Sequence, residues 1–141
     1  MTSSMKVDIV SAEAEIYSGT GKMLFAPAVM GDVGVMPQHT PLLTKIKPGQ
    51  VKVITEEDEE LLFFVSGGML EILPQGVTIL ADTAHRADHL DEAKALAAKE
   101  RVEKLLADRK DDIDYAAAES ELHEAVVQLK MIKNLKKKLH R

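Results

Sequence analysis

The order of hydrophobic and polar residues divides the chain into two parts. In the first part, short apolar runs alternate with turn-forming residues, a pattern typical of β-strands. Partial alternation, as in VKVIT at residues 51–55 and VTIL at residues 77–80, indicates strands that are buried on one face. We expect nine strands, at Lys6–Ser11, Ala14–Tyr17, Lys22–Ala26, Val33–Met36, Thr44–Ile46, Gln50–Thr55, Leu61–Ser66, Met69–Leu73 and Val77–Ala81.

Turn signals separate these predicted strands. They lie at residues 18–21, 31–34, 48–49, 67–68 and 74–76. The acidic run EEDEE at residues 56–60 joins two apolar runs, and we expect it to form a solvated hairpin turn. Many short strands at this spacing predict a β-sandwich or barrel.

The second part of the chain follows a helical pattern. All eight glycines and all five prolines lie at or before Gly76, and the remaining 65 residues contain neither. From about Leu90 the chain is rich in strong helix formers. Asp91 is placed to cap a helix that runs to about Asp108. We therefore expect an α+β fold, with an antiparallel β-sandwich in residues 1–87 and an antiparallel two-helix hairpin in residues 88–141.

The second helix is expected to begin at Asp112 or Asp114 and to run almost to the end of the chain. It carries a stripe with spacings of three and four, in which only Lys136 is neither apolar nor aromatic. The stripe consists of Tyr115, Ala118, Leu122, Ala125, Leu129, Ile132, Lys136 and Leu139. It could pack on Leu96, Val102 and Leu106 of the first helix, or leave that helix and pack on another protein. Because a two-helix hairpin buries little surface, we expect its docking to be marginal.

Composition and charge add a basic tail to this picture. The sequence has 141 residues, no cysteine and a formal net charge of −5. No acidic residue follows Glu124, so the segment 125–141 carries a net charge of +6 and the rest of the chain −11. An acidic body with a basic tail suggests that the tail contacts an acidic partner. No apolar run approaches the length of a membrane span, and the N-terminus lacks signal-peptide features, so we expect the protein to stay inside the cell.

Candidate catalytic and metal-binding residues are few. His85 and His89 have the spacing of two ligands on one helix face, but the segment is expected to precede the helix, so we favour ordinary surface histidines. His39 lies between two prolines and is expected to be a hydrogen-bonded turn residue. Ser66 lacks a nucleophile elbow, and the chain has no phosphate-binding loop. We therefore expect no enzymatic activity, no cofactor and no metal.

The basic tail alone does not predict nucleic-acid binding. The body is acidic, aromatic residues make up 4% of the chain, and there is no tryptophan. Two hypotheses remain. One is a binding or regulatory subunit with a detachable hairpin, and the alternative is a stand-alone ligand-binding β domain with a coiled-coil dimerisation hairpin.

Four blocks of sequence, in order, resemble the epsilon subunit of bacterial F-type ATP synthases. The opening VDIVSAE with YSG is similar to the first strands of that family. GDVGVMPQHTPLLTKIKPG at residues 31–49 resembles its most characteristic block, and SGGMLEILPQGVTILADTA resembles the block that closes its sandwich. LDEAKA and DYAAAESELHEAVVQL are similar to its two helices.

The resemblance implies a non-catalytic rotor subunit at the foot of the central stalk. Such a subunit binds the gamma subunit and the c-ring and couples proton-driven rotation to ATP synthesis in the alpha/beta hexamer. Its hairpin either stays folded or extends along gamma and inhibits ATP hydrolysis. The implied location is the cytoplasmic face of the bacterial inner membrane, with membrane contact only through the c-ring.

The resemblance also implies interface residues. By family position, Asp32 faces the c-ring, and the prolines and glycines of residues 31–49 form a stiff loop that need not reorganise on binding. The residues on the side of gamma and the c-ring are Asp32, His39, Pro41, Leu42 and Thr44. The tail lysines would meet acidic residues of alpha and beta when the hairpin is extended, or else form a solvated face; they are Lys130, Lys133, Lys136, Lys137 and Lys138.

One family motif is altered in this chain. Some members bind ATP on the folded hairpin through Ile/Leu-Asp-x-x-Arg-Ala, which here is LDEAKA at residues 90–95. Asp91 and Arg101 match nucleotide-binding positions, but Lys94 replaces the expected arginine and offers a point charge in place of a planar fork. His85 replaces an acidic residue. We therefore expect weak or no nucleotide binding.

Overall fold

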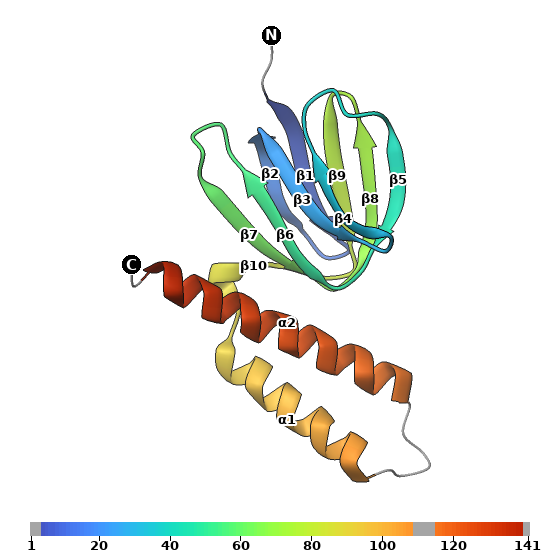
Figure 1. The fold of residues 1–141 in the computed structure, drawn as a ribbon, viewed down its shortest axis with the longest axis vertical. Helices are drawn as coiled ribbons and strands as arrows, with labels where there is room; N and C mark the ends of the chain where they lie inside the picture. The colour runs from blue at the N-terminus through green and yellow to red at the C-terminus, as the bar shows by residue number, and fades with distance from the viewer. Residues whose placement is uncertain (1–3, 109–114, 140–141) are drawn as a thin grey trace. The chain divides into compact units, whose positions relative to one another are not determined.

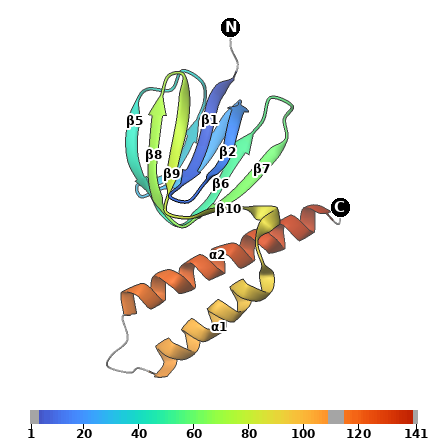
Figure 2. The ribbon, with the colours of Figure 1, turned by 180° about the vertical axis from the view of Figure 1, so that it is seen from behind.

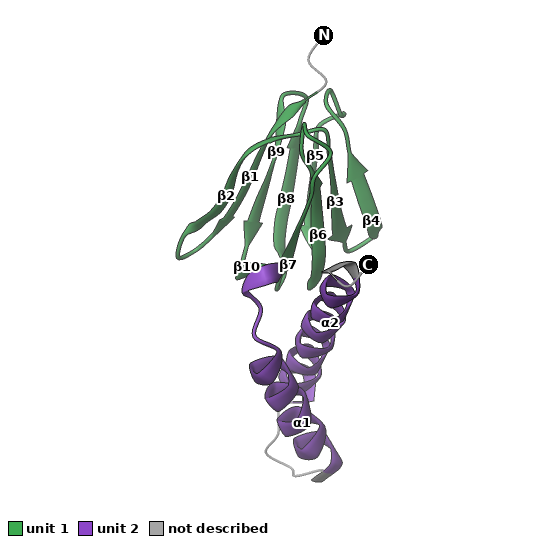
Figure 3. Ribbon diagram, turned by 90° about the vertical axis from the view of Figure 1, so that its left-hand side faces the viewer, with its two compact units in different colours: residues 1–86 green, residues 87–141 purple. Residues whose placement is uncertain are grey.

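The chain divides into two compact units, residues 1–86 and 87–141 (Figure 3). The structure is a computed structural model and describes residues 4–108 and 115–139. The first unit holds the strands, and the second holds a short 3-10 helix and two α-helices. The predicted α+β fold, a β-sandwich followed by two helices, is confirmed.

The first unit contains ten described strands (Figure 1). Their bounds are β1 Met5–Ser11, β2 Glu15–Gly21, β3 Met23–Ala28, β4 Gly31–Val35, β5 Leu42–Ile46, β6 Gly49–Ile54, β7 Glu60–Val65, β8 Gly68–Leu73, β9 Gly76–Ala81 and β10 Ala84–Arg86. The acidic run joins β6 to β7 as the predicted hairpin turn, with Asp58 in the left-handed region at φ 64°.

The strands form one folded-over sheet in the order β10-β7-β6-β3-β5-β8-β9-β1-β2, with β4 pairing on β3 (Figures 1 and 2). The pairs are antiparallel except β1 with β9, which run parallel from Lys6↔Gly76 to Ser11↔Ala81. This parallel pair departs from the predicted antiparallel arrangement. It joins the first described strand of the unit, β1, to β9, which lies about seventy residues later in the sequence.

The hydrophobic core lies between the layers of the folded sheet. Alternate side chains of the strands point inward, as the period-2 pattern predicts. The fully buried members include Val7, Leu24, Val51, Phe63, Ile72 and Ile79. Burying side chains of this size contributes about 1.5–3 kcal/mol each. All members of this core cluster belong to the first unit.

Two predicted turns are strands in the structure. Residues 18–21 belong to β2, where Ser18 pairs with Asp8 and also donates a 2.7 Å hydrogen bond to its carboxylate. Residues 31–34 belong to β4, which pairs with β3 from Ala28↔Gly31 to Leu24↔Val35. The backbone hydrogen bonds of the neighbouring strand outweigh the local preference of glycine for turns. The three-residue strand β10 was not predicted.

The second unit contains η1 (Ala87–His89), α1 (Glu92–Asp108) and α2 (Tyr115–Leu139). Asp91 caps α1 as predicted, because its Oδ1 accepts a hydrogen bond from the backbone N–H of Lys94 at 3.1 Å. The predicted caps of the second helix, Asp112 and Asp114, lie outside the described residues. The two helices pack side by side in antiparallel directions (Figures 1 and 3).

Small residues form much of the buried surface in the hairpin. The buried positions are Ala95 and Val102 in α1 and Ala118, Ala125, Met131 and Ile132 in α2. Of the residues predicted to face α2, Val102 is fully buried, whereas Leu96 is 45% exposed and its neighbour Ala95 is the buried position. Ala95 and Val102 are seven residues apart, which places them on one face of the helix.

Candidate functional site

The stretch 31–49 was predicted to be a stiff loop, and this is wrong for most of its length. It contains β4, β5 and a connection between them at residues 36–41. Within that connection, Gln38 has φ 70° and its N–H donates a 3.0 Å hydrogen bond to the carbonyl of Pro74. Rigidity in this stretch therefore comes chiefly from strand pairing.

Asp32 lies exposed on β4, next to the turn between β3 and β4. This turn also exposes two apolar side chains that the sequence analysis did not single out, Val29 and the 93% exposed Met30. Gly31, at φ 127°, supplies the left-handed backbone of the turn. The turn between β3 and β4 thus presents the carboxylate of Asp32 near the side chain of Met30, a combination suited to contact with another protein.

His39 is a half-buried residue of the connection between β4 and β5. Its Nδ1 lies 2.6 Å from the carbonyl oxygen of Thr40, which can only accept, so the ring nitrogen is the donor. This contact matches the expected hydrogen-bonded turn residue.

Of the other predicted residues of this surface, Leu42 and Thr44 lie in β5, and Pro41 directly precedes that strand. Pro41 and Leu42 are exposed, and Thr44 is half-buried. The structure adds Leu43, which the prediction omitted although it is 64% exposed. Adjacent side chains in a strand point to opposite faces, so the Leu42-Leu43 pair in the sequence indicated that the two leucines would lie on different faces of the sheet.

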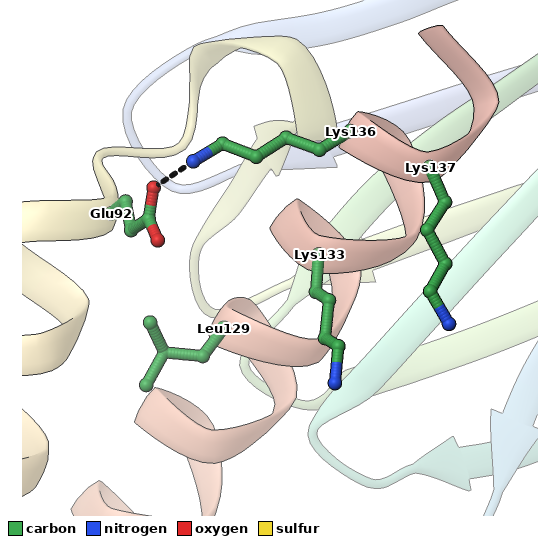
Figure 4. Close-up of a pocket in the computed structure, with 5 residues that line it drawn as sticks. All are labelled: Glu92, Leu129, Lys133, Lys136 and Lys137. Atoms are coloured by element: carbon green, nitrogen blue, oxygen red, sulfur yellow. Dashed lines mark hydrogen bonds and ion pairs between the residues drawn. The ribbon is translucent and has the colours of Figure 1, made fainter. Parts of the chain in front are cut away.

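The basic residues form a second candidate surface near the end of α2. Lys130, Lys133, Lys136 and Lys137 are all exposed, and the side chain of Lys138 lies outside the described residues. An open surface hollow of about 540 Å³ is lined by Glu92, Leu129, Lys133, Lys136 and Lys137. Figure 4 shows Lys136 extending to Glu92, while Lys133 and Lys137 extend away from that carboxylate.

The nucleotide candidates are engaged in contacts within the hairpin. The carboxylate of Asp91 caps α1, and the guanidinium of Arg101 forms an ion pair with Glu121 of α2. Lys94 is exposed on the first turn of α1. Weak or absent nucleotide binding stays a prediction.

His85 and His89 do not share a helix face. His85 lies in β10 opposite Phe64, and His89 lies in η1 with its Nε2 3.8 Å from Asp88. Among the described residues there is no group of three side chains that could hold a metal ion. Within the same residues, no helix has the length and apolar character needed to cross a membrane.

Solved structures with this fold include chains of two mitochondrial ATP synthases. One, from Euglena gracilis, superposes with a TM-score of 0.69 at 17% identity and covers 99% of this chain and 84% of its own. The other, from Tetrahymena thermophila, has a TM-score of 0.56 at 14% identity and covers 91% of this chain and 96% of its own. At these identities the similarity shows the fold.

Curated relatives are similar along nearly the whole chain. The ATP synthase epsilon chain of Nitrosococcus oceani is 59% identical over 139 residues, covering 99% of both chains. That of Nitrosospira multiformis is 57% identical over 134 residues, covering 95% of this chain and 96% of its own.

Two family models together match most of the chain. The beta-sandwich domain of the ATP synthase delta/epsilon chain matches residues 4–87, and the long alpha-helix domain of the same chain matches residues 88–133. Matches of both models in the order of the two units leave the family unambiguous. The chain therefore belongs to the delta/epsilon chain family of the F-type ATP synthases.

Proposed function

We propose that the chain is a non-catalytic central-stalk subunit that couples proton-driven rotation to ATP synthesis and restrains ATP hydrolysis through its helices. The observation that carries this function is the end-to-end similarity to bacterial ATP synthase epsilon chains, at 59% identity over 139 residues. The alternative of a stand-alone ligand-binding domain does not account for this similarity. In the structure α1 and α2 contact each other, and Ala118, Ala125 and Ile132 of the stripe are buried.

The first unit is the part that we assign to gamma and the c-ring. Its exposed carboxylate, Asp32, would pair with a basic residue of the c-ring, and the exposed Met30 would add apolar contact area. Leu43, which is 64% exposed, supplies a further apolar contact, which we assign to gamma. A folded sheet with a fully buried core would transmit torque with little deformation.

The second unit is the part that we assign to regulation. Its lysines, Lys130, Lys133, Lys136, Lys137 and Lys138, would contact acidic residues of alpha and beta when the hairpin extends. The protein would then lie at the cytoplasmic face of the bacterial inner membrane and contact the membrane only through the c-ring.

Capture of purified gamma by the immobilised full chain tests this function. We expect the chain to retain gamma, and Leu43→Asp to weaken the capture because it places a charge in the apolar surface. Leu96→Asp is the matched control, since Leu96 is also an exposed leucine but lies on α1. Self-association of the chain without capture of gamma would favour the stand-alone domain.

A further inference from the structure

An ion pair joins the two helices at the end of the hairpin opposite their connection. The Nζ of Lys136, near the end of α2, lies 2.5 Å from Oε2 of Glu92, the first residue of α1 (Figure 4). The helices are connected at the other end, between residues 108 and 115. The pair is therefore positioned to hold the separable ends of the two helices together.

The pair also explains why a lysine interrupts the apolar stripe of α2. Glu92 lies in the positive first turn of α1 and Lys136 near the negative end of α2, so each helix terminus favours the charge that it carries. The buried positions on either side of the interface include alanines, which supply little burial energy. An ion pair is therefore a larger share of the total stabilisation than it would be in a leucine-rich hairpin.

A second ion pair crosses the hairpin without involving the tail lysines. It joins Arg101 of α1 to Glu121 of α2. Both pairs hold the helices together, but Lys136 is the member that also belongs to the basic surface. Lys133 and Lys137 belong to that surface too, and they extend away from Glu92 (Figure 4).

We propose that Glu92 masks Lys136 in the closed hairpin and competes for it with the carboxylates of an acidic protein partner. In the closed hairpin the basic surface presents Lys133 and Lys137 while Lys136 is held by Glu92. Opening adds the charge of Lys136 to the same surface. This inference rests on the proposed inhibitory role of the hairpin, because that role supplies the acidic partner.

The expected size of the effect follows from the exposure of the pair. The side chains of Lys136 and Glu92 are 59% and 52% exposed. Pairs of this kind contribute little, so loss of either partner should raise the ratio of open to closed hairpin about two- to fivefold. Added salt screens exposed charges, so the same ratio should rise with ionic strength in the unmodified chain.

Distance measurement in the isolated chain tests the contact with Glu92. The sequence has no cysteine, so spin labels can be attached at Ala93→Cys and Asn134→Cys, two exposed positions near the pair. We expect Glu92→Gln and Lys136→Gln each to increase the open fraction, and the double variant to exceed neither, because all three break one interaction. Unchanged distances in both single variants would overturn the proposal.

Inhibition of ATP hydrolysis in the assembled complex tests the competition. Glu92→Gln should strengthen inhibition because it releases Lys136. Lys136→Gln should open the hairpin to the same extent but inhibit less than Glu92→Gln, because it removes a cation that the partner would contact. Lys137→Gln is the charge-matched control, since it should weaken inhibition without opening the hairpin. Glu121→Gln should open the hairpin and strengthen inhibition, as Glu92→Gln does.

The two variants of one pair thus give different degrees of inhibition with the same change in distance. Equally strong inhibition in Glu92→Gln and Lys136→Gln would show that Lys136 has no partner contact, and would overturn the competition. If removal of residues 88–141 leaves hydrolysis unchanged, the proposed inhibitory function fails. The distance measurement still reports separately whether Glu92 holds Lys136.

Discussion

At the scale of single residues, Gly68 allows β8 to approach the backbone of β9 closely because it has no side chain. It begins β8 with φ 141°, and its backbone pairs with both Ile46 and Ala81. A Cβ atom built at this position would lie 2.1 Å from the carbonyl oxygen of Leu80. The clashing atom belongs to the backbone of β9, so relief would require the strands to separate.

Gly68→Ala should therefore destabilise the protein strongly. We expect a loss of about 3 kcal/mol or more in the free energy of unfolding, since backbone strain and overpacking each cost about 1–3 kcal/mol. Urea denaturation measures this loss. Gly31→Ala is the control for strain alone, because Gly31 has φ 127° but a Cβ there would meet nothing within 4 Å. Equal losses in the two variants would contradict the role assigned to the close approach.

Residue identity predicted some members of the candidate surfaces and missed others. The resemblance to the family indicated Asp32, whereas the tail lysines could be identified from charge alone, because no acidic residue follows Glu124. The exposure of Met30 depends on a turn whose ends were misplaced, and the pairing of Lys136 with Glu92 depends on how two distant segments are phased. Neither of these features follows from a local pattern.

At the scale of elements, the start of α1 depends on a side-chain cap. Asp91 Oδ1 accepts the N–H of Lys94, and its backbone carbonyl accepts the N–H of Ala95 at 3.0 Å. The first bond uses the side chain and the second does not. A substitution that removes only the side-chain acceptor therefore isolates the contribution of the cap.

Asp91→Ala should lower the stability of α1 by about 1 kcal/mol. Asparagine caps about as well as aspartate, so Asp91→Asn should be close to neutral. Hydrogen exchange of the α1 amides measures both effects, and protection should fall in the alanine variant. Equal loss of protection in the two variants would instead indicate that the negative charge, and not the hydrogen bond, supports the first turn.

Elements could be predicted from sequence more readily than their partners. The absence of glycine and proline after Gly76 predicted both helices, and Asp91 predicted where the first helix begins. The end of β2 and the start of β4 were misjudged because glycines there pair with neighbouring strands. The parallel pairing of β1 with β9 joins residues about seventy positions apart, and no local periodicity encodes such a contact.

At the scale of the whole molecule, the two units differ in how they are stabilised. The core cluster of the first unit is built entirely from residues up to Ala84, and it includes Phe63 and several fully buried aliphatic side chains. The second unit relies on a narrow helix interface and exposed ion pairs. Cooperative unfolding of the first unit should thus not require the second.

Deleting every residue after Ala87 should leave a folded sandwich that still binds gamma. The deletion removes no member of the core cluster, so a cooperative urea transition and gamma capture should both persist. In the assembled complex the same deletion should raise ATP hydrolysis, because it removes the lysines that we assign to the acidic surfaces of alpha and beta. Retained gamma binding with unchanged hydrolysis would separate the two functions, leaving coupling in the sandwich and denying the hairpin its inhibitory role.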